Sequence, residues 1–561
     1  MPPKSLNILD ELDDSTQEWA PSNEGSGHPL GEPTRNRPLE PNLLFLGENS
    51  SVMATLRKAL PERINLVYID PPFATGHAWH YRPEANSASK KPGSARGAVQ
   101  THAYGDAWGS GPDTYLAWMK ERLEEIHALL HPEGSLLLHC DHRASPYLSI
   151  ICDEIFGPGD RRSGPPRPGF RNEIVWAYGL GGSSPRCYPK KHDTILWYTK
   201  GTQWTFNPPM VPATSAKMRG ELKKAPDTWM IPTLNNMARE RTGYPTQKPL
   251  QLLERIVEAH SNPGDLVADF FSGSGTTLEA AEKKGRQWIG CDATPMAVHV
   301  AKKRLLDLGH RQSFRVVDLS PYEGRLWYAS NFVAKGKQAS SEQHYRKHIL
   351  KAYEATKIGT SGSFHGTKSN SLVWVAPFDH RISSSDLDRI EESIVEQGQK
   401  SVHILGWQWD LDDPLDCNKR SVDFALIQIP RSLIAHGSGE DTPHLFLERP
   451  RVELKMEKTG GLGLSLKLQK LWHAHPTMLP IPTSEHPDGP LELLDQWAVD
   501  WNHDGSTFQY AWVSGRSRKI QTMEFCTSEH IFPGPGPHRI AVKVVDAFGT
   551  SMTQTLRVEF A

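Results

Sequence analysis

The sequence predicts an α/β fold built around a sheet with buried strands. Three features support this class: short apolar runs bounded by turn residues, helix-like stretches between those runs, and a glycine-rich turn that follows one of the runs. Apolar runs without alternation are typical of strands that are buried on both faces. Strands of this kind that alternate with helices indicate an α/β sheet.

The first part of the sheet is expected between residues 43 and 139. Strands at Leu43–Leu46 and Leu66–Ile69 enclose a helix at Met53–Leu60, and a helix at Tyr115–Leu130 leads to a strand at Ser135–His139. The regular pattern returns at residue 250. It predicts a helix at Leu250–His260, a strand at Leu266–Phe271, a helix from about Thr276 to Lys284 and a strand at Gln287–Gly290.

The stretch between these two parts, residues 161–248, has a different character. Pro and Gly are frequent, Trp and Tyr are interspersed, and the apolar period is weak. It holds 15 Lys or Arg and five Asp or Glu, an excess of ten positive charges, whereas the whole chain has 63 Lys and Arg against 65 Asp and Glu. A nearly neutral protein that gathers its positive charge in one insert has a candidate surface for nucleic acid.

A chain of 561 residues is too long for one hydrophobic core, so two or three domains are expected. Residues 1–40 are rich in Pro, Ser, Gly and acids and predict a disordered tail. We place the first α/β domain at 41–335, an accessory α/β region at 336–435, and a β-rich, sandwich-like domain at 436–561.

Few elements of the last two regions are clear from the pattern. They are strands at Leu372–Val375, Val402–Leu405 and Phe424–Ile429, a helix at Ser384–Gln397, and a hairpin of His538–Val545 and Thr553–Phe560 around a turn at 546–549.

Composition excludes several classes of protein. No stretch approaches the roughly 18 apolar residues of a membrane span, and acids interrupt the apolar residues of the N-terminus, unlike in a secretory signal. We therefore expect a soluble, cytoplasmic protein without membrane partners. The six cysteines form no C-x-x-C pair, which argues against a metal site and a disulfide scaffold.

The glycine-rich turn is the first candidate site. It runs from Asp269 to Thr277, between an apolar strand and a helix, and Asp292 ends the next strand. Gly273 and Gly275 allow backbone N–H groups to approach a ligand, and Asp292 can accept hydrogen bonds from two ribose hydroxyls. The third glycine of a dinucleotide site and the Gly-Lys-Ser/Thr of a P-loop are both missing. Taken alone, such a turn is often plain architecture.

The second candidate site is Asp70-Pro71-Pro72-Phe73, directly after the strand at Leu66–Ile69. The loop after a parallel strand faces the ligand crevice. The prolines donate no hydrogen bonds and hold the chain extended, so the Asp70 carboxylate and the Pro71 carbonyl are rigid acceptors. With the flat ring of Phe73 they suit a planar base that carries an NH₂ group. Taken alone, the tetrapeptide fits a strand-ending turn with a buried Phe better.

The two sites together resemble the amino-methyltransferases of DNA, whose signature combines D/S/N-P-P-Y/F/W with F-x-G-x-G. The chain has Asp70–Phe73 and Phe271–Gly275 in this order, which is the permuted order of the beta class that includes type III modification subunits. Further matches are Tyr244–Pro249, before the cofactor helix, and Lys191–Tyr198. The resemblance covers about 42 to 330.

This resemblance implies a Rossmann-like, S-adenosylmethionine-dependent methyltransferase fold. The catalytic residues would be Asp70, Pro71, Pro72 and Phe73. The cofactor-binding residues would be Asp269, Phe271, Gly273, Gly275, Thr276, Asp292 and Lys248.

The expected substrate is a base amine in double-stranded DNA. Asp at position 70 is associated in this family with adenine N6, and N4 of cytosine is the near alternative. No cysteine follows a proline, so a C5-cytosine mechanism is not expected. A catalytically silent DNA-binding or assembly subunit of a defence system is the alternative from another class.

The basic insert is expected to recognise the DNA target, because Lys and Arg displace counterions from phosphates and can read base edges. A single Lys or Arg is more often a solvated charge, so only the cluster is informative. The candidate contacts are Arg171, Arg186, Lys190, Lys191, Arg219 and Arg241. Restriction–modification remains open, with a separate restriction subunit or a homodimer as partners.

Overall fold

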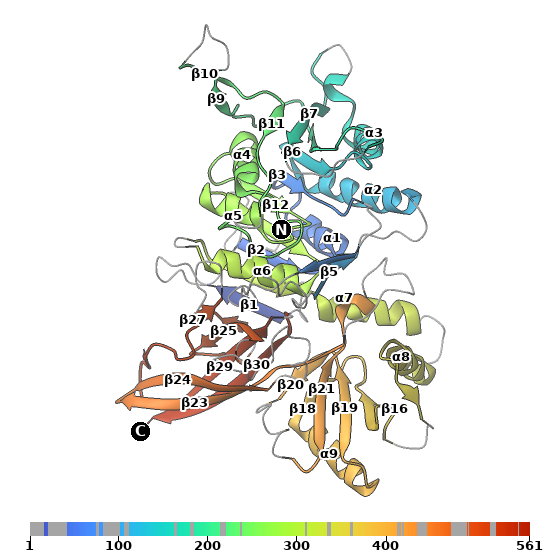
Figure 1. The fold of residues 1–561 in the computed structure, drawn as a ribbon, viewed down its shortest axis with the longest axis vertical. Helices are drawn as coiled ribbons and strands as arrows, with labels where there is room; N and C mark the ends of the chain where they lie inside the picture. Colours follow the sequence, from blue (N-terminus) through green and yellow to red (C-terminus); the bar gives the residue numbers. More distant parts are fainter. Residues whose placement is uncertain are drawn as a thin grey trace, which may run out of the picture. The chain divides into compact units, whose positions relative to one another are not determined.

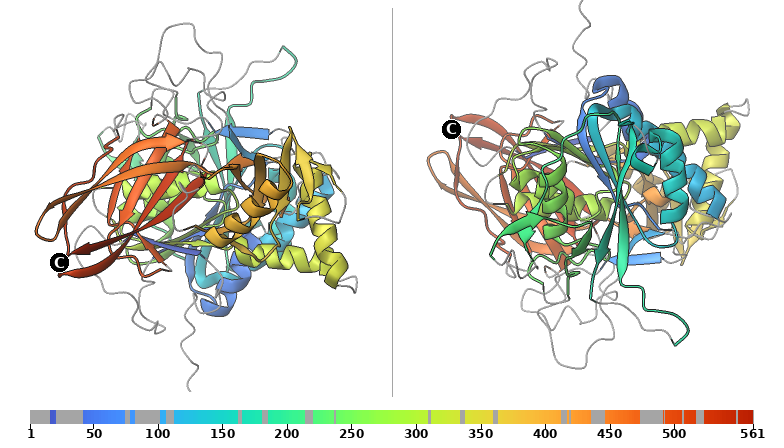
Figure 2. Two further views of the ribbon diagram at one scale, coloured as in Figure 1. Left: turned by 90° about the horizontal axis from the view of Figure 1, so that it is seen from below. Right: turned by 90° about the horizontal axis from the view of Figure 1, so that it is seen from above.

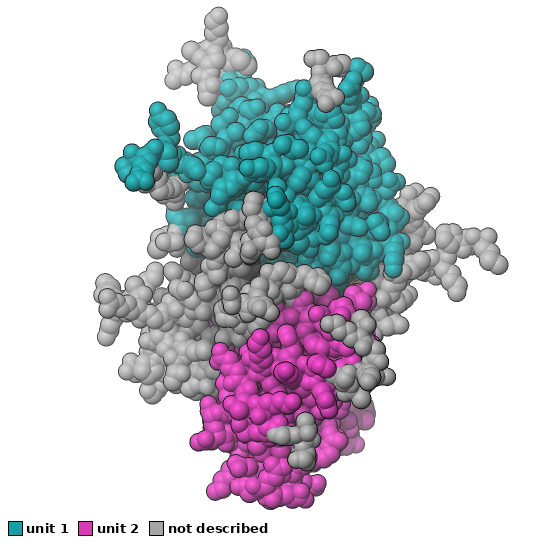
Figure 3. All heavy atoms as spheres, turned by 90° about the vertical axis from the view of Figure 1, so that its right-hand side faces the viewer, with its two compact units in different colours: residues 1–13, 20–81, 102–319 teal, residues 14–19, 82–101, 320–561 magenta. Residues whose placement is uncertain are grey.

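The computed structural model describes residues 16–20, 42–73, 78–81, 101–105, 112–161, 165–179, 185–213, 220–235, 238–308, 311–333, 338–358, 363–411, 417, 420–434, 446–472, 491, 493–505, 507–516, 523–547 and 549–560. The chain divides into two compact units (Figure 3). Unit 1 comprises residues 1–13, 20–81 and 102–319, and unit 2 comprises residues 14–19, 82–101 and 320–561.

Unit 1 is built on a mixed sheet (Figure 1). Its strands, in order across the sheet, are β11 (Thr228–Met230), β7 (Gly169–Ala177), β8 (His192–Thr199), β6 (Leu130–Cys140), β3 (Ile64–Ile69), β12 (Leu266–Asp269), β13 (Gln287–Asp292), β2 (Asn42–Leu46) and β14 (Phe314–Asp318). The strands from β6 to β14 are parallel to their neighbours, whereas β8 is antiparallel to both β6 and β7. The strands predicted for this unit are confirmed.

Helices cover both faces of this sheet, with α1, α2 and α3 on one side and α4, α5 and α6 on the other (Figure 2). Their bounds are α1 (Asn49–Ala59), α2 (Pro112–Leu129), α3 (Ser145–Phe156), α4 (Leu250–His260), α5 (Thr276–Lys283) and α6 (Pro295–Leu306). Unit 1 therefore has the predicted Rossmann-like α/β fold. Among the described residues, no helix is both long and apolar enough to cross a bilayer.

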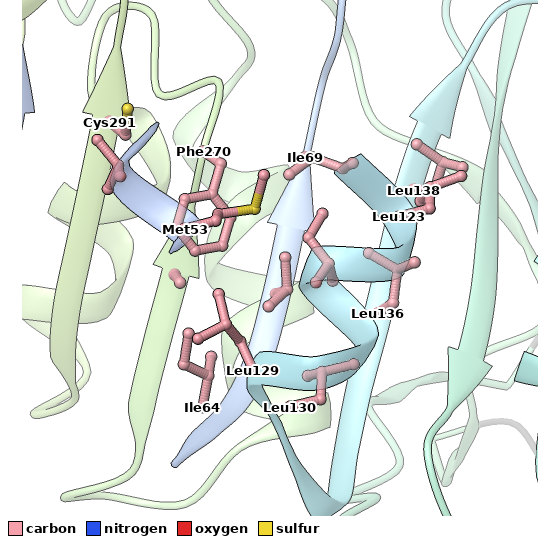
Figure 4. Packing of buried hydrophobic residues seen from close by; sticks show 14 of the residues in the cluster. Met53, Ile64, Ile69, Leu123, Leu129, Leu130, Leu136, Leu138, Phe270 and Cys291 are labelled. Atoms are coloured by element: carbon pink, nitrogen blue, oxygen red, sulfur yellow. The ribbon is translucent and has the colours of Figure 1, made fainter. Parts of the chain in front are cut away.

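The core of unit 1 explains why its parallel strands are mostly apolar. On one face, Leu123 and Leu129 of α2 pack with Met53 of α1 against strand residues such as Ile69 and Leu138 (Figure 4). All of these side chains are fully buried. Fully burying such a side chain contributes about 1.5–3 kcal/mol.

The weak period of residues 161–248 concealed three strands of the main sheet: β7, β8 and the short β11. In β7 the buried and half-exposed residues alternate, which is typical of a strand near a sheet edge, whereas β8 is buried along most of its length. The prolines and glycines that weaken the pattern lie mainly outside these strands. The insert therefore supplies part of the sheet.

Unit 2 contains a second α/β sheet with the order β15 (Thr356–Lys357), β16 (Gly366–Lys368), β17 (Ser371–Val375), β19 (Ser401–Gly406), β21 (Asp423–Gln428) and β22 (Leu447–Glu448). Its helices are α7 (Ser320–Tyr328), α8 (Gln338–Ala352) and α9 (Ser384–Glu396). The strands and the helix predicted for this part are confirmed.

The rest of unit 2 is β-rich. One sheet contains β23 (Arg451–Gly460), β24 (Gly463–Trp472) and β28 (His530–Ile531), and the other contains β27 (Trp512–Gly515), β25 (Leu494–Asp500), β29 (Gly536–Asp546) and β30 (Ser551–Phe560). Buried residues of both sheets form one apolar cluster, as in a sandwich. The predicted hairpin is β29–β30.

Most of the tail predicted at residues 1–40 lies outside the described residues. Residues 16–20 form β1 (Thr16–Ala20), which pairs in parallel with β26 (Thr507–Gln509).

Candidate functional site

The two candidate loops lie side by side at the carboxyl ends of two central strands in the sheet of unit 1. Strands β3 and β12 are parallel neighbours, with Leu66 paired to Val267 and Val67 paired to Ala268. Asp70 directly follows β3, and Asp269 ends β12, so both loops leave the sheet at the carboxyl ends of adjacent strands. In open α/β sheets, ligands bind outside the carboxyl ends of the strands.

Lys248 connects the two loops. Its ammonium donates a hydrogen bond to Oδ2 of Asp70, and its backbone carbonyl accepts one from Oγ1 of Thr276 at 3.4 Å. Only 13% of the Lys248 side chain and 17% of the Asp70 side chain are exposed, so this ion pair is largely shielded from water. The other oxygen of Asp70, Oδ1, is buried and has no hydrogen-bond partner among the described residues. The carboxylate therefore has one oxygen held and one available.

Phe73 lies beside this carboxylate as an aromatic plate. The Lys248 ammonium is 5.6 Å from the centre of its ring, and the ring of His139 is 5.9 Å away with a tilt of 32°. Pro71 is buried, and Pro72 and Phe73 are half-buried. Since the prolines have no N–H, this loop offers mainly acceptors.

A buried hydrogen-bond chain lies behind Phe73. Both ring nitrogens of His139 form hydrogen bonds. Nδ1 is 2.9 Å from the hydroxyl of Tyr68, and Nε2 is 3.2 Å from Oδ2 of Asp193. Tyr178 donates to Oδ1 of Asp193 at 3.0 Å. Burial raises the pKa of Asp193, but the hydrogen bonds from His139 and Tyr178 and the charge of Lys248 together bring it below its ordinary value.

The topology explains why Asp193 lies at the same end of the sheet as Asp70. Because β8 is antiparallel to β6, the start of β8 lies beside the end of β6, where Cys140 pairs with Thr194. Neither His139 nor Tyr178 was among the predicted site residues. The available signal was that His139 lies at the carboxyl end of a predicted parallel strand.

The turn after β12 requires both of its glycines. Gly273 has φ +48° and Gly275 has φ +73°, a region that glycine adopts most easily. A Cβ on Gly275 would lie 2.7 Å from the Cβ of Ala301, and a Cβ on Gly273 would lie 3.3 Å from the ring of Tyr244. At Gly275 the start of α5 therefore comes closer to α6 than a side chain would allow.

Two carboxylates support the turn. Asp269 accepts hydrogen bonds from the N–H of Phe271 at 3.0 Å and from Oγ1 of Thr277 at 2.5 Å, and burial raises its pKa to about 7. Asp292 accepts from the N–H of Gly273 at 2.9 Å and from Thr294, and burial also raises its pKa. Part of the hydrogen-bonding capacity of both groups is thus used by the chain itself.

These groups are suited to a cationic ligand. Asp70, Asp269 and Asp292 lie at the carboxyl ends of three adjacent strands, and the charges of Asp70 and Asp292 add to the effect of burial in raising the pKa of Asp269. Lys248 is the cation that pairs with one of them. The Ser272 hydroxyl is buried and has no hydrogen-bond partner within the described parts of the chain. A ligand with a sulfonium or an ammonium group fits this combination of excess negative charge and open polar atoms.

The loop between β7 and β8 carries most of the predicted DNA-binding residues that the structure describes. Arg186, Lys190 and Lys191 are exposed, and Tyr188 between them is 94% exposed. The loop leads directly into Asp193 at the start of β8. A basic loop therefore lies at the end of the sheet where Asp70 is located.

The other predicted contacts differ. Arg171 is buried, pairs with Asp160 at 2.8 Å and stacks on the ring of Trp204, so it stabilises the fold and we leave it out of the DNA surface. Arg241 is half-buried and donates to the carbonyl of Leu234. Arg219 lies outside the described residues.

The comparisons with known proteins agree with the family resemblance of the sequence. A family model described as a DNA methylase, N6_N4_Mtase, matches residues 64–303. DNA adenine methyltransferase YhdJ of Escherichia coli is 26% identical over 274 residues, which cover 46% of this chain and 81% of YhdJ. The type II methyltransferase M.ScaI of Streptomyces caespitosus is 32% identical over 217 residues, covering 34% of this chain and 67% of M.ScaI.

Two solved structures are also similar. The crystal structure of an M1.HpyAVI–SAM complex is 21% identical, with 47% of this chain and all of that chain covered and a TM-score of 0.32. The cytosine-N4-specific PvuII DNA methyltransferase is 19% identical, with coverages of 48% and 88% and a TM-score of 0.34.

The chain belongs to the DNA amino-methyltransferase family, as the matches to the family model and to M.ScaI establish. It is a DNA methyltransferase of the N6/N4 group, and the family uses S-adenosylmethionine.

Proposed function

We propose that this chain transfers the methyl group of S-adenosylmethionine to N6 of an adenine that has been rotated out of double-stranded DNA. The observation that carries the proposal is the carboxylate of Asp70, beside the glycine turn of the neighbouring strand: Lys248 holds Oδ2, and the buried Oδ1 has no hydrogen-bond partner among the described residues. A base amine needs such an acceptor, and a methyl donor has to bind close to it.

Hydrogen bonding and positioning account for the chemistry. The lone pair of an exocyclic amine is delocalised into the ring and is weakly nucleophilic. Acceptance of its two N–H groups by Oδ1 of Asp70 and the carbonyl of Pro71 draws the nitrogen toward tetrahedral geometry and directs the lone pair at the donor. Fixed acceptors and orientation supply most of the effect, so no covalent nucleophile is needed. Stacking on Phe73 replaces the neighbours that the base leaves in the duplex.

The cofactor would lie over the glycine turn. Bound S-adenosylmethionine supplies a methyl group on a cationic sulfur. The backbone at Gly273 and Gly275, where a side chain is absent, would border the cofactor, and the carboxylates of Asp269 and Asp292 would provide complementary charge. The further residues proposed to border the cofactor are Phe271, Thr276 and Lys248, the last through its backbone, whose carbonyl accepts a hydrogen bond from Thr276.

Adenine is favoured over cytosine on two grounds. Aspartate stands at position 70, and the similar YhdJ is a DNA adenine methyltransferase. The test is to methylate DNA with the purified chain, digest the DNA to nucleosides and identify the product by mass spectrometry. N6-methyladenine is the expected product, whereas N4-methylcytosine would overturn the choice of base. DNA binding without any methylated nucleoside would favour a silent assembly subunit.

The exposed basic loop would hold the DNA backbone next to the extruded base. Arg186, Lys190 and Lys191 can neutralise phosphates, and the exposed ring of Tyr188 can pack against the DNA. Because the loop leads into Asp193, phosphate contacts here would fix the DNA relative to the carboxylate of Asp70.

A further inference from the structure

The function of Lys248 is not explained by a cofactor contact alone. Its backbone carbonyl faces Thr276 of the cofactor turn, but its ammonium pairs with the carboxylate that would accept the target amine. The following residue, Pro249, has φ −62° and immediately precedes α4, so the backbone of Lys248 is fixed at the start of a helix. The ammonium lies at the end of a flexible side chain, so its position depends on the groups that it contacts.

The ammonium of Lys248 lies near a second carboxylate. Its positive charge is among the causes that lower the pKa of Asp193, and 15% of the Asp193 side chain is exposed. Asp193 is itself fixed, because His139 binds one of its oxygens and Tyr178 binds the other. His139 is fully buried and is held by Tyr68 on its other nitrogen.

These interactions connect Tyr68 to Asp70 through three intermediate side chains. Tyr68 and His139 fix Asp193 through hydrogen bonds, the negative charge of Asp193 attracts the ammonium of Lys248, and Lys248 binds Oδ2 of Asp70. Rotation of the Asp70 carboxylate is restricted as a result. Only Oδ1 remains for a hydrogen bond from the substrate.

On this basis, we propose that Lys248 and Asp193 are positioning residues for methyl transfer: Lys248, which binds Oδ2 of Asp70, orients this carboxylate so that Oδ1 faces the target amine, and the charge of Asp193 helps to keep the ammonium of Lys248 in place. Neither residue touches the reacting atoms. The inference rests on the proposed function and assigns part of its rate to these two side chains.

The test compares Lys248→Met, Asp193→Asn and the double variant with the wild type. We expect the single-turnover rate of methyl transfer at saturating cofactor and DNA to fall about 100-fold in Lys248→Met and about 10-fold in Asp193→Asn, since a small misplacement of a reacting group can cost this much. The double variant is expected to be no slower than Lys248→Met, because Asp193 acts only through Lys248. Dissociation constants for S-adenosylmethionine and for DNA should change less than about threefold, since the energy is lost from positioning.

Lys200→Met is the matched control. Lys200 is 14% exposed, like Lys248, and pairs with Glu62 at 2.8 Å, although Glu62 is itself 56% exposed. Glu62 precedes β3, whereas Asp70 follows it, so this ion pair lies at the opposite end of the strand from Asp70. Lys200→Met should leave the single-turnover rate unchanged and thereby separates loss of an ion pair from loss of orientation.

Two results would overturn the inference. A large rise in the dissociation constant of S-adenosylmethionine in Lys248→Met, with an unchanged rate at saturation, would make Lys248 a cofactor ligand. Rate losses that multiply in the double variant would show that Asp193 acts independently of Lys248. A wild-type chain that transfers no methyl group would instead remove the proposed function, and this inference with it.

Discussion

At the scale of single residues, the glycine turn shows why two neighbouring glycines are needed for different reasons. Both have positive φ, but a side chain at Gly275 would collide with Ala301 of α6, whereas one at Gly273 would meet only the ring of Tyr244. Gly275 therefore fixes how closely α5 and α6 pack. Gly273 keeps the surface of the turn open.

Gly275→Ala is expected to destabilise the protein by more than the strain of its backbone alone. The αL conformation costs an alanine about 1 kcal/mol, and the contact with Ala301 adds a steric cost of about 1–3 kcal/mol. Gly264→Ala is the control, because Gly264 has φ +87° and nothing within 4 Å of the added Cβ. Calorimetric melting should show the larger loss for Gly275→Ala. Equal losses would mean that the close packing is unimportant.

The identity of the site residues was predictable, but their partners were not. Asp70 and the two glycines were recognisable because their types and order follow a motif. The pairing of Lys248 with Asp70 joins residues 178 positions apart, and only the folded sheet brings them together. The burial of Arg171 was equally hidden, because an arginine in a strand looks the same in the sequence whether it faces water or Asp160.

At the scale of elements, periodicity predicted what is buried on a regular face. The strands β3, β6, β12 and β13 were found because both faces of the sheet are covered by helices and leave continuous apolar runs. Strand β7 was missed because its alternating pattern is short and lies among prolines and glycines.

The contact between α1 and α2 depends on Arg122, a feature that periodicity does not reveal. Arg122 is 3% exposed, pairs with Glu48 at 2.5 Å, donates to Asn49 at 2.8 Å and stacks on Trp118. Arg122→Met should lower stability by about 3 kcal/mol, because it leaves a shielded carboxylate without its partner.

The control for this prediction lies on the same helix. Lys120 pairs with Glu154 on the exposed surface, so Lys120→Met should leave the melting temperature nearly unchanged. Similar melting temperatures for the two variants would show that Arg122 does not hold α1 to α2.

At the scale of the whole molecule, the distribution of charge matters more than its sum. The chain has a formal charge of −2, so attraction to DNA has to come from the basic insert. The count of charged residues in 161–248 predicted that positive charge is concentrated there. It could not show that Arg186, Lys190 and Lys191 share one exposed loop beside the candidate site, because this depends on the pairing of β7 with β8.

The salt dependence of DNA binding should reflect this loop. Replacing Arg186, Lys190 and Lys191 together by Ala should reduce the slope of log affinity against log salt by about 2–3, since each phosphate contact contributes about 0.9. Lys455→Ala, on the exposed part of β23, serves as the control. Fluorescence anisotropy over a range of salt concentrations measures both slopes, and an unchanged slope in the triple variant would exclude the loop from DNA binding.

The most direct test of the central claim is the activity of Asp70→Ala. If the open oxygen of Asp70 receives the target amine, this variant should bind S-adenosylmethionine and DNA with nearly normal affinity and transfer no detectable methyl group in a single-turnover assay. A variant that methylates DNA at the wild-type rate would show that the carboxylate at this strand end does not act on the amine.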